Sequence, residues 1–246
     1  MGKQSNGPEI AATRTISFTT VVDLSWPIHP GIPLWPGDPA IEFQVMTNLD
    51  ADGYFMRRFS MGEHSATHMN APSSFYPDGL SVDQYAPESL VAPAAVIDGR
   101  RLASSDADCT LGVDDVHAWE KEHGPVPQGS ILLLYTGWQD NWSQTKAYLG
   151  GDVPGALHFP GFGQDAARYL LEERGVLGLG IDTHGVDGGQ NRTFSINKLV
   201  LQQPRMVLEN LCNLHQLPPT GATLVIGLPR LEGGSGAPVA VLAFVP

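Results

Sequence analysis

The sequence predicts a single α/β (α+β) domain with a strand-rich core and few helices. Short apolar runs rich in β-branched residues recur along the whole chain, with turn residues between them. Helical periodicity is confined to fewer segments. With 246 residues, 42% of them hydrophobic, the chain is long enough to bury a sizeable core, and no change of composition marks a linker.

The expected elements follow from these patterns. Strands are predicted, in chain order, at residues 16–24, 40–46, 54–61, 94–97, 131–135, 176–181, 223–226 and 239–244. A helix at 113–123 is preceded by Gly112 and stopped by Gly124-Pro125, and a helix at 164–174 ends at Gly175. A third, shorter helix is predicted at 207–214. Residues 1–15 are expected to be a flexible tail, and residues 16–246 a single domain.

Charge and composition narrow the function classes. The formal net charge of −12 argues against nucleic acid and against an anionic membrane as partners, because both need a basic surface. The sequence has no run of 18 apolar residues and no secretory signal at its start. Two cysteines without a local pairing pattern are typical of a reducing compartment. These observations predict a cytoplasmic protein without a nucleic-acid or membrane partner.

One short segment concentrates side chains that bind metals or move protons. His64 and His68 are four residues apart, and Asn70 follows two residues later, in a segment expected to be a loop after the strand at 54–61. Imidazole suits Zn and other transition metals, and an amide oxygen adds an uncharged ligand. These three ligands give a dication no compensating anion. Hydrogen-bonded structural histidines are the alternative interpretation.

Two further places could carry chemistry. The predicted strand at 176–181 runs into Asp182-Thr183-His184, and ligand sites are common where strands of α/β proteins end. The alternative there is a turn in which Asp182 and Asp187 bind backbone amides. Glu209 lies in an apolar stretch, so a cation, an amide or a basic side chain should accompany it. A structural ion pair with Arg205 is the alternative.

Several short motifs, in their order along the chain, resemble those of the cyclase-like metal-dependent hydrolases, a family that includes bacterial kynurenine formamidase and isatin hydrolase. The motifs are Asp23-Leu24-Ser25, Pro33-Leu34-Trp35-Pro36-Gly37-Asp38-Pro39, the segment 64–75, Phe159-Pro160-Gly161, Gly180-Ile181-Asp182-Thr183, Leu208-Glu209-Asn210-Leu211 and Gly233-Gly234-Ser235-Gly236-Ala237-Pro238. The resemblance covers residues 20–246. It implies the swivelling β/β/α fold of that family.

The chain departs from the family's signature loop, His-x-Gly-Thr-His-x-Asp-x-Pro-x-His. Its His64, Thr67, His68 and Pro72 match that pattern, whereas the glycine, the metal-binding aspartate and the closing histidine are replaced, by Ala66, Asn70 and Ser74. Members with a second metal use a histidine and, twelve residues later, a glutamate. Here the glutamate is Glu209, and the histidine is replaced by Asn197.

The resemblance implies a catalytic domain that hydrolyses a small-molecule substrate, a cyclic or acyl amide or a lactone, with one divalent metal, Zn or Mn, held by His64, His68 and either Asn70 or Glu209. Because a serine hydroxyl is no base near neutral pH, His184 or Glu209 would take the role of the closing histidine. The predicted catalytic residues are His64, His68, His184, Glu209 and Ser74, and the predicted substrate-binding residues are Trp35, Phe55, Phe75 and Thr67.

Two other functions remain open at this level. The first is a metal-independent cyclase, dehydratase or isomerase in which His64, His68 and Glu209 act as acid–base groups. The second is a catalytically inactive ligand-binding homologue that keeps only the pocket. The resemblance also implies a homodimer or homotetramer, since relatives form such assemblies.

Overall fold

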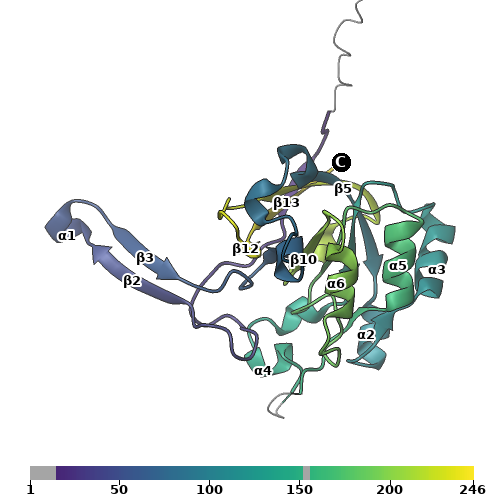
Figure 1. Cartoon of the computed structure of the whole chain (residues 1–246), viewed down its shortest axis with the longest axis horizontal. Coiled ribbons are helices and arrows are strands. Elements are labelled where there is room, and N and C mark those ends of the chain that lie inside the picture. Colours follow the sequence, from purple (N-terminus) through teal and green to yellow (C-terminus); the bar gives the residue numbers. More distant parts are fainter. Residues whose placement is uncertain (1–14, 152–155) are drawn as a thin grey trace, which may run out of the picture.

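A nine-stranded sheet forms the centre of the molecule in the computed structural model, which describes residues 15–151 and 156–246 (Figure 1). The strand order is β1-β13-β11-β5-β7-β9-β10-β4-β12. The strands are β1 Thr20–Asp23, β4 His68–Asn70, β5 Val91–Asp98, β7 Ile131–Tyr135, β9 Gly178–Ile181, β10 Met206–Glu209, β11 Thr220–Gly227, β12 Gly236–Pro238 and β13 Ala240–Val245.

The middle of the sheet is parallel, and both of its faces are covered. Strands β5, β7, β9 and β10 run in the same direction, whereas every other neighbouring pair in the sheet is antiparallel. Along β7, Leu133 belongs to one hydrophobic cluster, and Leu132 and Leu134 belong to the cluster on the opposite face. Burial on both faces explains why this strand reads as a continuous apolar run.

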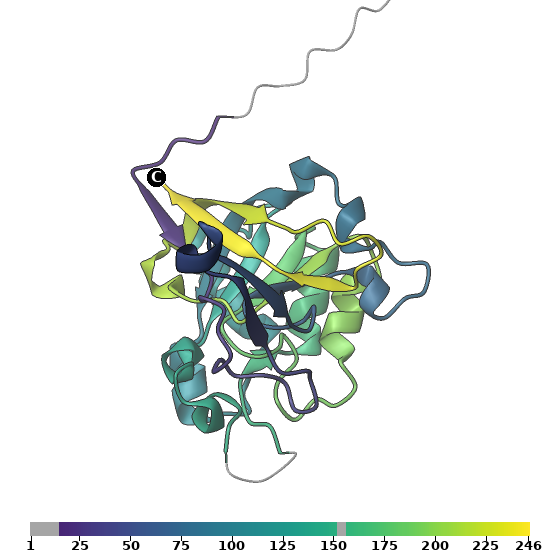
Figure 2. The ribbon, with the colours of Figure 1, turned by 90° about the vertical axis from the view of Figure 1, so that its left-hand side faces the viewer.

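Helices cover one face, and the sheet's own curl covers the other. Helices α2 Arg100–Ser105, α3 Val113–His123, α5 Gln164–Glu172 and α6 Ser195–Leu201 lie together on one side of the sheet (Figure 1). On the other face, Val22 of β1, Met69 of β4 and Val241 of β13 share one cluster, although β1 and β4 lie near opposite ends of the sheet. Figure 2 shows β13 in yellow beside β1 in purple.

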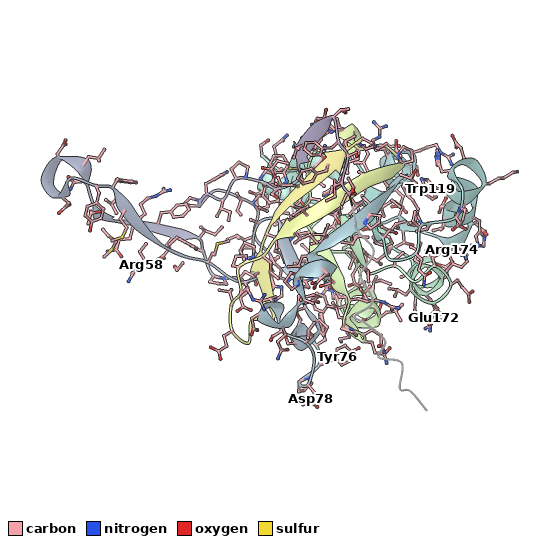
Figure 3. All side chains as sticks on the ribbon, turned by 90° about the horizontal axis from the view of Figure 1, so that it is seen from above. Arg58, Tyr76, Asp78, Trp119, Glu172 and Arg174 are labelled. Atoms are coloured by element: carbon pink, nitrogen blue, oxygen red, sulfur yellow. The ribbon has the colours of Figure 1, made fainter. Side chains whose placement is uncertain are left out.

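A hairpin projects from this body (Figures 1 and 3). It consists of β2 Glu42–Thr47, helix α1 Leu49–Asp52 and β3 Met56–Ser60, and its two strands form a separate sheet. The remaining elements are short: a parallel ladder of β6 Thr110–Leu111 with β8 Gly161–Phe162, helix α4 Thr145–Tyr148, and five 3₁₀ turns at Pro72–Ser74, Val82–Gln84, Pro87–Leu90, Trp138–Asn141 and Leu214–Gln216. Within the described ranges, no helix has the length and apolarity needed to cross a membrane.

Most of the predicted elements are confirmed. Every predicted strand overlaps an observed strand, and the predictions at 131–135 and 113–123 agree with β7 and α3 residue for residue. The predicted tail, residues 1–15, lies outside the described residues except for its last position. The α/β fold with a strand-rich core and few helices is therefore as expected.

Two assignments are wrong. The predicted helix at 207–214 is instead strand β10, buried between β9 and β4, followed by an irregular turn in which Asn210 and Asn213 have φ of 57° and 58°. That left-handed conformation cannot continue an α-helix. The segment expected to be a loop at 64–75 contains β4, a buried strand of the central sheet. Both segments are too short for periodicity to distinguish the states.

Candidate active site

A cavity of about 300 Å³ lies beside strands β4, β9 and β10. Its polar side chains come from β4 and the segment before it, from the segment after β9, from the end of β10 and from the start of α6: His64, His68, Asn70, His184, Glu209 and Asn197. Its apolar wall includes Trp35, Phe75 and Phe194. The structure therefore brings together residues that are more than 140 positions apart in the sequence.

The pairing of β4 with β10 sets the centre of the site. His68 lies directly opposite Glu209 in this antiparallel ladder, and Asn70 lies opposite Val207. Residues two apart in a strand share a face, so His68 and Asn70 both face Glu209. Met69, between them, points the other way into the core and is fully buried. A strand, rather than the expected loop, thus fixes the direction of these side chains.

The turn before β4 explains two features of the sequence. Ala66 has φ of +58°, a conformation that favours glycine, which is the residue that the resembling family carries there. Thr67 is buried, and its hydroxyl donates to the Asn210 carbonyl at 2.6 Å and accepts from the Trp26 amide at 3.0 Å. Thr67 was predicted to bind substrate, but these bonds use its hydroxyl to fix the turn.

Glu209 is a buried carboxylate whose hydrogen-bonding capacity is full. Its Oε1 accepts from the Val186 amide at 2.9 Å and from Asn197 Nδ2 at 3.0 Å. Its Oε2 accepts from Asn70 Nδ2 at 3.0 Å and lies 3.2 Å from His68 Nε2. Burial alone would raise the pKa of Glu209, but these bonds, led by the one from His68, lower it. The predicted alternative partner, Arg205, instead donates to the Leu171 carbonyl.

Asp187 is a second carboxylate in the cavity wall, joined to Glu209 through Asn197. Its Oδ1 accepts from the Ile196 amide at 2.7 Å and from Asn191 Nδ2 at 2.8 Å. Its Oδ2 accepts from the backbone and side-chain amides of Asn197 at 3.0 and 3.1 Å. Burial raises the pKa of Asp187. Because Asn197 Nδ2 also donates to Glu209, one amide group bridges the two carboxylates.

Asn70 forms a second amide bridge. Its Nδ2 donates to Glu209 Oε2 and to Asn197 Oδ1, both at 3.0 Å, while its Oδ1 accepts from His64 Nδ1 at 2.7 Å. If the amide were turned over, the Asn70 oxygen atom would lie 3.0 Å from Glu209 Oε2, and two acceptors would face each other without a hydrogen atom between them. Asn70 therefore presents hydrogen atoms, not lone pairs, toward Glu209.

The two histidines of the β4 segment differ in their surroundings. His68 Nδ1 lies 3.0 Å from the Ala66 carbonyl and Nε2 lies 3.2 Å from the Glu209 carboxylate, so both nitrogen atoms face acceptors and carry protons. His64 Nε2 shares a hydrogen bond of 3.0 Å with Ser235 Oγ. Burial, followed by the nearby His68 charge, lowers the pKa of His64. The site thus contains one buried imidazolium–carboxylate pair next to a neutral imidazole.

His184 is the one histidine of the cavity with an unused nitrogen. It is buried, and its Nε2 has no hydrogen-bond partner among the residues that the structure describes. Burial and the charge of His68 lower the pKa of His184 to about 4, against weaker opposing effects that include a hydrogen bond to the Leu34 backbone. His184 is therefore neutral at pH 7, lines the cavity and keeps a buried ring nitrogen without a hydrogen-bond partner.

Aromatic rings form the apolar part of the cavity wall. Trp35 contacts His184 edge-on at a ring-centroid distance of 5.5 Å, and Phe194 lies 5.9 Å from both Trp35 and Phe75. Phe55 was predicted to join them, but it lies at the start of β3 on the hairpin, is 55% exposed and does not line the cavity. Sequence order placed Phe55 near the His64 segment, whereas the hairpin carries it away.

The other predicted residues are placed as follows. Ser74 lines the cavity, but its hydroxyl donates to the Ser235 carbonyl at 2.6 Å. Asp182 accepts from the Thr136 backbone amide and hydroxyl at 2.9 and 2.7 Å, which is a structural role, although Thr136 follows β7 and does not belong to the same turn as Asp182. Asn191 and Phe194 also line the cavity, although neither was predicted as part of the site. The loop that precedes α6 brings them to the cavity, and no local pattern marks them.

The donor set does not fit a divalent cation in this arrangement. The polar atoms of the three predicted ligands are already paired with other residues. His64 contacts Asn70 and Ser235, and His68 contacts Ala66 and Glu209. Asn70 contacts His64, Asn197 and Glu209. Both nearby carboxylates have filled all four acceptor positions. Over residues 15–151 and 156–246, no three His, Cys, Asp or Glu side chains are grouped so that they could hold a metal ion. The predicted metal ligands are thus a self-contained hydrogen-bonded cluster.

Comparisons with known proteins agree with this fold. The family model described as "Putative cyclase" matches residues 22–188. Isatin hydrolase of Roseibium aggregatum is 33% identical over 100% of this chain and 99% of its own length. Kynurenine formamidase of Erythrobacter litoralis is 25% identical over 91% of this chain and 94% of its own length.

Solved structures give the same result. Isatin hydrolase A of Ralstonia solanacearum superposes with a TM-score of 0.86, at 35% identity over 92% of each chain. A protein described as a potential metal-dependent hydrolase with cyclase activity shares the fold with a TM-score of 0.69, at 23% identity over 92% of this chain and 98% of its own. Curated relatives of the chain are thus hydrolases of amides. By the match to its family model and by its identity to isatin hydrolase, this chain belongs to the cyclase family.

Proposed function

We propose that the cavity binds a small, flat amide and that His184 activates the water molecule that hydrolyses it. The unpartnered Nε2 of His184 is the observation that carries this proposal. A neutral imidazole with a free lone pair, buried beside an aromatic wall, can accept a proton as a general base. The residues of the site fit no divalent cation as they are arranged, so the mechanism uses side chains alone.

The shape of the cavity supports a flat substrate. A volume of about 300 Å³ is at the small end of ligand sites, and Trp35, Phe75 and Phe194 offer ring faces and edges on one side. The relatives named above are consistent with this: isatin is a flat cyclic amide, and a formamidase hydrolyses an acyl amide. A cyclic or acyl amide attached to an aromatic ring is the proposed substrate class.

The charged and neutral groups of the site support a hydrolysis in three steps: deprotonation of water with attack on the carbonyl, stabilisation of the resulting negative charge, and cleavage of the C–N bond. His184 Nε2 takes a proton from water as the oxygen attacks the carbonyl carbon of the amide. Negative charge then develops on the carbonyl oxygen in a buried site that contains the His68 imidazolium, which stabilises it electrostatically. The proton held by His184 passes to the amide nitrogen as the C–N bond breaks, which leaves a carboxylic acid and an amine.

The test is a hydrolysis assay with isatin and N-formylkynurenine. His184→Asn should lower kcat by about 10²–10⁴-fold, the usual contribution of a general base. His123→Asn, the same change at an exposed position of α3, is the matched control and should leave kcat unchanged. A chelator should not lower the rate. If His184→Asn keeps at least a tenth of the wild-type kcat, His184 is not the base. If the wild-type protein hydrolyses neither compound, the substrate class is wrong.

We also propose that the hairpin binds a second copy of this chain. A two-stranded hairpin alone is marginally stable in water, yet this one exposes a set of large apolar side chains: Val45, Met46, Leu49, Tyr54, Phe55, Met56 and Phe59. Its strand β3 carries Arg57 and Arg58, while the chain as a whole has a net charge of −12 (Figure 3). A second copy therefore offers both apolar surface and opposite charge.

Light scattering after gel filtration tests this assembly. The wild-type protein should elute as a dimer or tetramer, and Phe59→Asp should shift it toward the monomer. Leu231→Asp, at an exposed apolar position of the body, is the control and should not change the mass. A monomeric wild-type protein, or an unchanged mass in Phe59→Asp, would exclude the hairpin as the contact.

A further inference from the structure

The amide of Asn70 occupies the point where the acceptors of the site converge. Its two hydrogen atoms are donated to Glu209 and Asn197, and its oxygen accepts from His64. Asn197 does the same one step further, with its two hydrogen atoms on Glu209 and Asp187. Three of these four amide hydrogen atoms are donated to the two buried carboxylates, and the fourth joins the two amides.

A carboxylate in place of the Asn70 amide would reverse this arrangement. It would lie about 3 Å from Glu209 and would offer no hydrogen atom, and two carboxylates at that distance cannot both be ionised without a proton or a cation between them. The same change would place two carboxylates and two imidazoles around one point. Such a set of oxygen and nitrogen ligands is typical of Zn²⁺ sites.

We propose that the amides of Asn70 and Asn197 replace a divalent cation in this chain, and that Asn70 alone decides between a metal-free and a metal-binding cluster. The chain then folds and keeps its cavity without metal, in contrast to relatives described as metal-dependent hydrolases. This inference concerns ion binding and is measured without turnover, so it stands or falls separately from the proposed hydrolysis.

The first measurement uses the tag-free wild-type chain. Elemental analysis after purification should give far less than one Zn or Mn per chain. Titration calorimetry with Zn²⁺ and Mn²⁺ should show no site that depends on His68, and excess metal should shift the melting temperature by less than about 1 °C. A one-to-one isotherm that disappears in His68→Ala would overturn the proposal. An isotherm that persists in His68→Ala reports a site elsewhere and leaves the cluster metal-free, as proposed.

The second measurement compares Asn70→Asp with Asn70→Ala. Both lose the amide bridge, and each should melt about 5–10 °C below the wild-type protein in a chelator. Only Asn70→Asp adds a charged ligand. Because partners of metal ligands alone change affinity by 10–100-fold, a direct ligand should raise Zn²⁺ affinity by at least about 100-fold over wild type.

Saturating Zn²⁺ should therefore restore the melting temperature of Asn70→Asp and leave that of Asn70→Ala low. Equal Zn²⁺ affinity in the two variants would overturn the role given to Asn70. Should Asn70→Asp fold only in the presence of Zn²⁺, the metal requirement is shown directly, and if it stays unfolded with Zn²⁺, the proposed switch is wrong. The wild-type titration decides the metal-free state in each case.

Discussion

The buried His184 makes stability depend on pH in a way that can be worked out from its surroundings. The groups that face it are the imidazolium of His68, the carboxylate of Glu209, the rings of Trp35 and Tyr148 and the Leu34 backbone. Burial and the His68 charge lower its pKa from 6.5 to about 4. The folded protein thus holds this ring neutral at pH values where the unfolded chain protonates it.

The direction and size of the effect follow from proton linkage. Above pH 6.5 the ring is neutral in both states, and His184 causes no loss of stability. As pH falls from 6.5 to about 4, the unfolded state gains the proton first, so the free energy of unfolding decreases by about 1.4 kcal/mol per pH unit. The total loss over this window is about 3 kcal/mol, and it stops growing below pH 4, where the folded protein also binds the proton.

Urea unfolding of the wild-type protein and His184→Asn, at pH 7.5 and pH 4.5, measures this term. Asn keeps a nitrogen donor near the position of Nδ1 but does not titrate, so the variant should lose about 3 kcal/mol less than the wild-type protein between the two pH values. Contributions from Glu209 and His64 occur in both proteins and cancel in the difference. Equal losses in the two proteins would refute the lowered pKa of His184.

Three more results are expected. Ala66→Gly relieves a positive φ but removes a buried methyl group, so urea unfolding should change by less than about 0.5 kcal/mol, whereas Ala94→Gly in β5 should destabilise by about 1–2 kcal/mol. Thr67→Val should lower the free energy of unfolding by about 1–3 kcal/mol and leave KM within about twofold, because the Thr67 hydroxyl bonds to backbone groups. A large rise in KM without a loss of stability would show that Thr67 binds substrate. The hydrolysis rate should stay level from pH 8 to about 5 and fall toward pH 4 as His184 is protonated.

Local patterns were sufficient for strands β5, β7 and β9 and for the long helices. Strand β7 is an unbroken apolar run, and α3 lies between two glycines, so each carries its own boundary signals. Strand β10 carries none. Its sequence, Met206–Glu209, is equally compatible with a helix turn, and it is a strand because β9 and β4 flank it on both sides. Tertiary pairing, which no local window contains, decided that assignment.

The same distinction applies to the site. His64, His68 and Asn70 are close in sequence, and Glu209 was conspicuous as a carboxylate in an apolar stretch. Asp187 and Asn197 line the cavity because α6 begins beside β10. Phe55 lies outside the cavity because the hairpin projects away from it. Sequence order could not supply either relation.

The charge problem of the His64 segment has a physical solution in the structure. Two neutral imidazoles and an amide gave a dication no anion, and the structure shows Glu209 beside them with all four acceptor positions filled. One amide would satisfy only part of that carboxylate, because Asn70 reaches Oε2 and Asn197 reaches Oε1. Each asparagine therefore satisfies one oxygen atom of Glu209. Restoring a metal-type residue at one position leaves the other amide in place, which is why Asn70→Asp isolates the contribution of a single ligand.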